Sequence, residues 1–269
     1  MNVRQLRPDF GAEIIDFDIH GSSSSADIEQ LRAALDQHQL LLLRSQQKIP
    51  PERQVEICSW FGPPMNNGKG SWSVLHNDEA SGRIRLPFHS DFSYTEGPIK
   101  VISLHAIEVP EGGTTTSYVS GMCAWASLPD ELKQQLASMT LRHRHVSSIG
   151  TDWPEFTADH PVCKSHPRTG RPILFVTEHH ADRINELQLD ASRATLERLF
   201  LHLYAPAHVY THQWQLHDLI IWDNLALQHG RPDVAEPAEG IRAMQRVAIN
   251  EVSVSELVAR ARRLQAASA

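Results

Sequence analysis

Three residues of this chain have the types and the spacing that suit a metal site. His89 and Asp91 are separated by one residue. Residues two apart on an extended strand project to the same face, so an imidazole and a carboxylate converge there. A third ligand is needed, and His229 follows the apolar segment 219–222 far downstream. Two imidazoles and one carboxylate leave the other metal positions open, which is the arrangement of non-haem iron(II) oxygenases.

Other interpretations of these residues stay open, because a lone His-x-Asp pair often binds no metal. A zinc hydrolase uses the same kinds of ligand with an activated water, and it needs a nearby general base. A non-catalytic jelly-roll binding protein is the second alternative. The chain has 16 histidines, more than one mononuclear site can use. We interpret His143, His145, His179 and His180 as packing or solvated residues.

Further motifs give the chain a family resemblance that covers nearly its whole length. They are Phe88-His89-Ser90-Asp91-Phe92-Ser93, Gly112-Gly113-Thr114-Thr115, His160-Pro161-Val162, His166-Pro167-Arg168-Thr169-Gly170-Arg171, Trp222-Asp223-Asn224, and Arg242 with Arg246. In this combination the sequence resembles the taurine dioxygenase and 2,4-dichlorophenoxyacetate dioxygenase (TauD/TfdA) family of iron(II)/2-oxoglutarate enzymes. The resemblance implies a double-stranded β-helix, the cupin-like jelly roll, with flanking helices.

The resemblance also implies a role for individual residues. His89, Asp91 and His229 would ligate Fe(II), with 2-oxoglutarate and O2 as co-substrates. Arg242 occupies the family position whose planar guanidinium pairs with the distal carboxylate of 2-oxoglutarate. Thr115 would give a hydroxyl to the same carboxylate, with its neighbours Thr114 and Thr116 as alternatives.

The expected substrate residues follow from the same resemblance. Arg246 falls where relatives hold the anionic end of their substrate, although it could also serve 2-oxoglutarate or the fold. The other pocket candidates are Asn66, Asn67, Lys69 and Tyr94. The expected reaction is hydroxylation or desaturation of a small, anionic organic molecule, with release of succinate and carbon dioxide.

The elements that must position these residues can be predicted from hydrophobic spacing and from turn signals. The predicted helices are 27–37, 51–61, 129–138 with Ser127 near its cap, 192–204 and 254–269. The predicted strands are 40–44, 101–107, 173–176, 219–222 and 245–250, and 66–82 is predicted to be a loop. Short strands with inserted helices indicate an α+β protein built on a barrel or sandwich.

Length and composition limit the class of protein. A chain of 269 residues is ordinary for one β-rich domain, so we expect a single domain over 1–269. The net charge of −7 and the lack of a basic cluster argue against nucleic acid as a partner. No apolar run is long enough for a membrane span. The N-terminus lacks the order of a secretory signal, so we expect a cytoplasmic protein, and whether it forms a homo-oligomer is left open.

Overall fold

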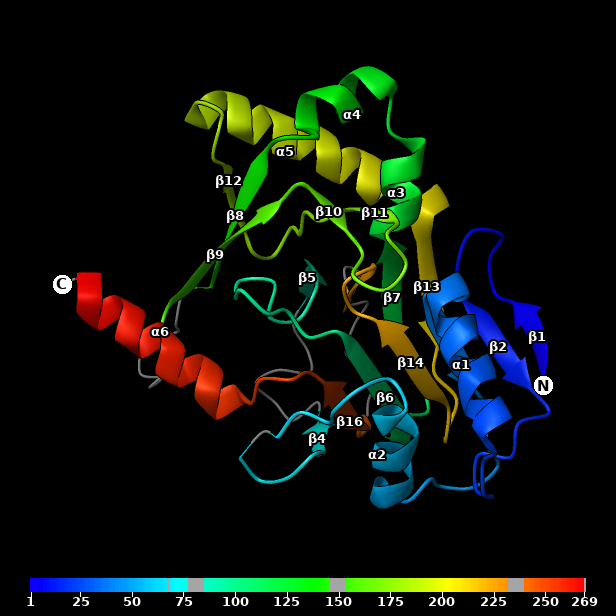
Figure 1. Cartoon of the computed structure of the whole chain (residues 1–269). Coiled ribbons are helices and arrows are strands. Elements are labelled where there is room, and N and C mark those ends of the chain that lie inside the picture. The colour runs from blue at the N-terminus through cyan, green and yellow to red at the C-terminus, as the bar shows by residue number, and fades with distance from the viewer. Residues whose placement is uncertain (67, 77–84, 146–152, 232–239, 269) are drawn as a thin grey trace.

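The computed structural model describes residues 1–66, 68–76, 85–145, 153–231 and 240–268 (Figure 1). Its helices are α1 (Ser25–His38), α2 (Pro51–Ser59), α3 (Gly121–Ser127), α4 (Asp130–Leu136), α5 (Leu189–Leu203) and α6 (Val254–Ser268), with the short 3-10 helix η1 (Pro206–His208). None of the helices in the described ranges is both long and apolar enough to cross a membrane.

Two sheets form the body of the protein. The larger has the order β1 (Asn2–Gln5), β2 (Ala12–Ile15), β3 (Leu40–Leu43), β14 (Leu219–Asp223), β6 (Val101–Glu108), β16 (Ala243–Ile249) and β4 (Ser73–His76). The smaller has the order β13 (Val209–Gln213), β7 (Thr115–Ser120), β15 (Leu227–Arg231) and β5 (Leu86–His89). Apart from the parallel β2–β3 pair, the pairs within these two sheets are antiparallel.

The strands that lie between residues 140 and 184 form two further small sheets. One has the order β12 (Ala181–Ile184), β8 (Thr140–His145) and β9 (Phe156–Pro161), and the other pairs β10 (Cys163–Ser165) with β11 (Pro172–Leu174). In Figure 1 they lie beneath α5 at the upper side of the molecule. The segment before β12 contacts β5 at the edge of the smaller sheet, since the His179 N–H donates to the Phe88 carbonyl at 3.3 Å.

The main core lies between the two large sheets. Buried Tyr118 of β7 and Leu227 of β15 belong to the same apolar cluster as Trp222 of β14 and Met244 of β16. The Tyr118 and Trp222 rings meet edge to face, with their centroids 5.5 Å apart. Facing sheets with side chains interdigitated between them form a sandwich core. This is the α+β sandwich that the sequence pattern predicts and the jelly roll that the family resemblance implies.

Helices cover the outer faces of both sheets. Leu31 and Leu35 of α1 and Ile57 of α2 pack on the outer side of the large sheet, against residues such as Leu41 of β3. The outer face of the smaller sheet is covered by α3, α4 and α5, whose cluster includes Val119 of β7. Each sheet is therefore held between a central core and a helical layer (Figure 1).

Most of the predicted elements are present, and two predictions were wrong. Ser127 does not cap a helix: it is the last residue of α3, and Pro129 holds the N-cap position of α4. The predicted loop 66–82 contains the strand β4, which exists because it pairs with the distant strand β16. Residues 67 and 77–82 of that loop lie outside the described residues.

Candidate metal and co-substrate site

The structure brings His89, Asp91 and His229 together at one end of the smaller sheet. His229 of β15 lies directly opposite His89 of β5 in the antiparallel register, and their ring centroids are 4.3 Å apart. Asp91 Oδ1 lies 3.2 Å from His89 Nε2 and 3.9 Å from His229 Nε2. One ligand atom from each residue lies within 4.8 Å of those of the other two.

Asp91 reaches this position by a turn rather than by strand alternation. The strand β5 ends at His89, and Asp91 begins the turn that follows. Phe92 is in the left-handed region, with φ of 60°, which is uncommon for a residue other than glycine. The prediction that His89 and Asp91 converge is confirmed, but the expected cause, alternation along one strand, was wrong.

The electrostatics of Asp91 and His229 suit metal ligation. Burial raises the pKa of Asp91, but the positive charge of the nearby Arg246 is the largest of the opposing effects, and together these hold that pKa well below its ordinary value. Burial lowers the pKa of His229 to about 3. Asp91 is therefore ionised and His229 neutral at neutral pH, which are the protonation states that metal ligands need.

The ring of His89 is oriented by the backbone. Its Nδ1 lies 2.9 Å from the carbonyl oxygen of Pro87 and donates to it, since a carbonyl can only accept. That tautomer leaves the Nε2 lone pair facing Asp91 and His229, as is usual for a metal-ligating histidine.

A cavity of about 480 Å³ opens beside His229. Arg242, Arg231 and Thr116 are among the residues that line it. Arg242 is buried, and burial, followed by the charge of Arg231, lowers its pKa to about 10. The guanidinium group thus stays charged at neutral pH, and the cavity offers two cations next to the metal-site histidine.

The threonine that faces this cavity is Thr116, and the structure does not place the predicted Thr115 there. Tyr118 lies directly opposite His229 in the β7–β15 pair, and Thr116 shares its face because it is two residues away. Thr115 projects from the other face. Thr116 Oγ1 accepts a hydrogen bond from Trp214 Nε1 at 2.9 Å. Its own hydroxyl hydrogen can still be donated to a carboxylate.

Arg246 contacts the metal-site carboxylate directly. Its Nη2 lies 2.6 Å from Asp91 Oδ2, whereas the other carboxylate oxygen, Oδ1, lies near the histidines. Both side chains are about one-fifth exposed. One oxygen of Asp91 therefore faces the histidines while the other faces a guanidinium group, a contact that the sequence did not predict.

The other predicted substrate residues are dispersed. Asn66 and Lys69 are exposed, and neither is among the residues that line the cavity beside His229. Asn67 lies outside the described residues. Tyr94 is buried and its ring stacks on His145, while it lines a separate cavity of about 280 Å³ beneath α6. Tyr94 nevertheless lies close enough to the metal site for the charges of Asp91 and Arg246 to act on its hydroxyl.

The sequence analysis missed Arg231, and strand alternation could have found it. Arg231 is two residues beyond His229 on β15, so both side chains project toward the same cavity. The intervening Gly230 packs so closely that a Cβ atom at this position would lie 2.8 Å from the carbonyl oxygen of Leu86. A glycine between two functional residues was the available signal.

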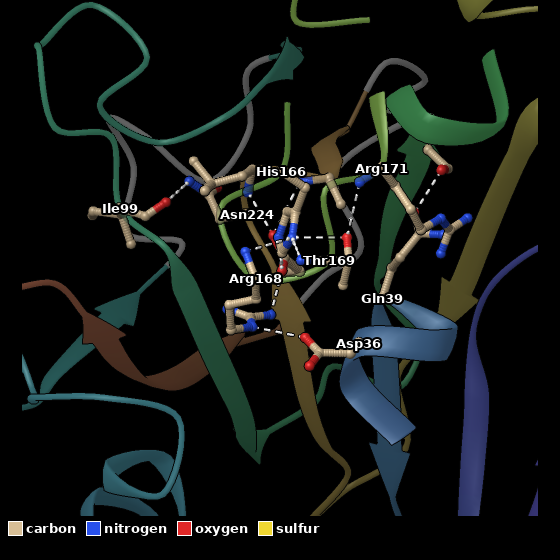
Figure 2. A network of polar contacts seen from close by, with 12 residues as sticks. Asp36, Gln39, Ile99, His166, Arg168, Thr169, Arg171 and Asn224 are labelled. Atoms are coloured by element: carbon tan, nitrogen blue, oxygen red, sulfur yellow. Dashed lines mark hydrogen bonds and ion pairs between the residues drawn. The ribbon is translucent and has the colours of Figure 1, made fainter. Parts of the chain in front are cut away.

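The sequence analysis used the Trp222-Asp223-Asn224 motif for the family resemblance but did not predict what its residues contact. Buried Asp223 accepts hydrogen bonds from His166 Nε2 at 2.8 Å and from Arg168 at 2.7 Å. Figure 2 shows this network, which Arg168 extends to Asp36 of α1. Asn224 hydrogen-bonds to the backbone of Asp91. The motif therefore supports the site without lining its cavity.

The donor set fits the implied iron and 2-oxoglutarate. Two imidazoles and one carboxylate match the facial arrangement of non-haem iron(II) centres. A dicarboxylate such as 2-oxoglutarate needs a buried cation for the carboxylate that does not reach the metal, and Arg242 lines the cavity that begins at His229.

Comparison with known proteins agrees with this chemistry. The chain matches the family described as "Taurine catabolism dioxygenase TauD, TfdA family" over residues 2–248. It is 27% identical over 260 residues to pentalenolactone F synthase of Streptomyces avermitilis, covering 82% of this chain and 85% of that protein. It is 24% identical over 258 residues to the alpha-ketoglutarate-dependent 2,4-dichlorophenoxyacetate dioxygenase of Cupriavidus pinatubonensis, covering 83% of this chain and 89% of that protein. A crystal structure of a taurine dioxygenase from Burkholderia xenovorans shares the fold, with a TM-score of 0.82 at 23% identity over 92% of this chain and 90% of that chain.

The fold and the candidate site together define an iron(II)- and 2-oxoglutarate-dependent dioxygenase. Because the family match extends over residues 2–248, the chain belongs to the TauD/TfdA family. The resemblance inferred from the motifs is confirmed. The zinc hydrolase and the non-catalytic jelly roll gain no support from these comparisons.

Proposed function

We propose that His89, Asp91 and His229 hold the iron and that the substrate is a small organic anion. In this proposal Arg242, Arg231 and Thr116 bind 2-oxoglutarate. One observation carries the assignment: His229 and the buried Arg242 line the same cavity of about 480 Å³. A metal ligand and a buried cation that share one cavity suit a co-substrate that chelates the metal at one end and carries a charge at the other.

The residues prepare the site for an oxidation that the bound cofactors supply. Iron, 2-oxoglutarate and O2 together provide the oxidant that hydroxylates or desaturates the substrate, with release of succinate and carbon dioxide. Asp91 contributes a charged carboxylate oxygen, and His89 and His229 contribute imidazole nitrogens. Arg242 fixes the distal carboxylate of 2-oxoglutarate, and burial strengthens that ion pair because little water competes with it.

The anionic substrate class is supported by Arg246. Its contact with Asp91 uses Nη2, and a guanidinium group carries five N–H donors. The same side chain can therefore hold a substrate anion next to the metal site, where a fixed anion orients the C–H bond to be oxidised. The relative from Cupriavidus pinatubonensis acts on 2,4-dichlorophenoxyacetate, which is itself a carboxylate.

A paired substrate screen tests the substrate class. Carboxylates, sulfonates and sulfate esters, with 2,4-dichlorophenoxyacetate among them, are each compared with a neutral amide or ester of the same carbon skeleton. Succinate formed and substrate oxidised are measured together. We expect coupled turnover with at least one anion and at least tenfold less with its neutral partner. Equal coupled turnover for both would refute the anionic class while leaving the oxygenase class intact.

Two further predictions belong to this proposal. We infer a single domain over residues 1–269, and limited proteolysis should then give no stable fragment that unfolds independently of the rest. We also propose a cytoplasmic location, which fractionation of the producing cells would test.

A further inference from the structure

Asn224 makes three side-chain hydrogen bonds to the segment that carries Asp91, although it does not line the cavity beside His229. It follows β14, and it is fully buried. Its side-chain Oδ1 accepts a hydrogen bond from the Asp91 N–H at 3.0 Å, and its Nδ2 donates to the Asp91 carbonyl at 3.1 Å. The same Nδ2 donates to the carbonyl of Ile99 at 2.7 Å (Figure 2).

These bonds close the base of the turn that carries Asp91. Residues 92–98 leave the site after Asp91 and return at Ile99, whose N–H donates to the Asp91 carbonyl at 3.3 Å. The backbone N–H of Asn224 donates to the carbonyl of Lys100 at 2.9 Å. One amide group therefore joins the first and last residues of the turn and attaches both of them to the end of β14.

Asp223 extends the connection to the strand that carries His229. Its Oδ1 accepts hydrogen bonds from the N–H groups of Leu225 and Ala226, each at 3.0 Å. These bonds shape the short turn between β14 and β15. The two adjacent residues thus connect the chain segments from which Asp91 and His229 come.

We propose that Asn224 is a positioning residue for the metal site: by fixing both backbone polar groups of Asp91, it sets where the carboxylate lies relative to His89 and His229. Asn224 does not line the cavity beside His229, so its effect passes through Asp91. This inference rests on the proposed ligand role of Asp91. It assigns a function to a motif residue that the oxygenase chemistry itself does not use.

Only a carboxamide can make this set of bonds. The position requires one acceptor for an N–H and donors for two carbonyl oxygens, which the amide of asparagine supplies and an ionised carboxylate does not. Asn224→Asp keeps the shape of the side chain and places an acceptor against the carbonyls of Asp91 and Ile99. Asn224→Ala removes all three side-chain bonds.

A matched control lies at the other side of the same turn. Asn250 is also buried, and its Nδ2 donates to the carbonyl of Gly97 at 3.2 Å. It therefore anchors the same turn through a buried amide, but at a residue that is no ligand. Asn250→Asp and Asn250→Ala reproduce the loss of a buried amide without touching Asp91.

Calorimetric titration of purified protein with Mn(II) tests the inference without any turnover. We expect Asn224→Asp and Asn224→Ala to raise the Mn(II) Kd by about tenfold or more, the range found when groups supporting metal ligands are removed. The Asn250 variants should stay within about twofold of wild type. Circular dichroism establishes that each variant is folded at the titration temperature.

The stabilisation that saturating Mn(II) gives each variant provides a second readout. The rise in Tm on adding Mn(II) is compared within each variant, so a lowered baseline Tm does not obscure it. A smaller rise for the Asn224 variants than for the Asn250 variants supports the inference. Equal Kd values and equal Tm rises in the two series would overturn it. Absence of Mn(II) binding in wild type would overturn the proposed metal site together with this inference.

Discussion

Thr115 and Thr116 are neighbours in sequence and lie on opposite faces of β7, so the choice between them depends on strand register. The register follows from the pairing of Tyr118 with His229, a contact between residues that are far apart in the chain. The motif Gly112-Gly113-Thr114-Thr115 indicated that a threonine of this stretch serves the co-substrate. It did not indicate which one, because alternation along a strand is known only once one residue has been placed.

Replacing each threonine separately tests this choice. Thr116→Val should weaken 2-oxoglutarate binding by about 2 kcal/mol, roughly thirtyfold in Kd, because a hydrogen bond to a charged group is lost. The measurement is calorimetric titration of Mn(II)-loaded protein with 2-oxoglutarate. Thr115→Val is the matched control and should leave the Kd unchanged. The reverse result would restore the original assignment.

The charge of Arg242 gives a separate prediction about the same cavity. Arg242→Ala should weaken 2-oxoglutarate binding by about 2–5 kcal/mol, since a buried carboxylate loses its charged partner. The Mn(II) affinity should be retained because Arg242 is not a ligand. If Arg246→Ala weakens 2-oxoglutarate binding and Arg242→Ala does not, the roles of the two arginines are interchanged.

At the scale of elements, the metal site depends on how closely β5 and β15 approach each other. The register between these strands shifts between His229 and Arg231. Gly230 lies at that irregularity, where a Cβ atom would meet the Leu86 carbonyl at 2.8 Å and the Phe88 Cα at 3.2 Å. These are backbone atoms, which cannot move without shifting the strand that ends at His89.

Gly230→Ala should therefore disturb both stability and metal binding. We expect the free energy of unfolding to fall by about 1–3 kcal/mol, as for other overpacked positions, and the Mn(II) Kd to rise because the two histidines are displaced. Gly97→Ala is the control, since nothing lies within 4 Å of a Cβ atom built there. Urea unfolding and Mn(II) titration measure the two effects. An unchanged Mn(II) Kd in Gly230→Ala would mean that the strand spacing does not set the site.

Elements with strong local patterns could be predicted from the sequence, and those defined by long-range pairing could not. The helices α1 and α5 carry apolar residues at helical spacing, and the all-leucine strand β3 is a clear apolar run. The strands β5 and β15 hold the histidines, yet they are short and interrupted by proline or glycine. The ligands were found through residue types and family motifs. Arg231 was missed although alternation from His229 could have indicated it, whereas the contacts of Asn224 required the three-dimensional register.

For the whole molecule, the many histidines affect stability as well as chemistry. Burial is the main cause that lowers the pKa of His143 to about 3 and that of His105 and His160 to about 4. His143 is fully buried between the rings of His160 and Phe175. These histidines are packing residues, as predicted for His143, and the folded protein keeps them uncharged.

This arrangement predicts destabilisation by mild acid. The unfolded chain protonates each histidine near its ordinary pKa of about 6.5, while the folded chain does so only near pH 3–4 for these residues. The unfolded state thus binds more protons below pH 6.5, and stability falls as the pH falls toward 4, by up to about 1.4 kcal/mol per pH unit for each histidine. Urea unfolding between pH 7.5 and 5 measures the slope. His143→Leu should reduce it relative to wild type, with His20→Leu, which replaces an exposed histidine, as the control.

The most direct test of the whole account is an anaerobic titration of Fe(II)-loaded protein with 2-oxoglutarate, followed by visible absorption. We predict one Fe(II) per chain, a weak charge-transfer band that saturates with 2-oxoglutarate in wild type, and loss of iron binding and of the band in His89→Ala and His229→Ala. His143→Ala should retain the band under conditions in which the variant is folded. Wild-type protein that binds zinc tightly but gives no band with Fe(II) and 2-oxoglutarate would contradict the assignment.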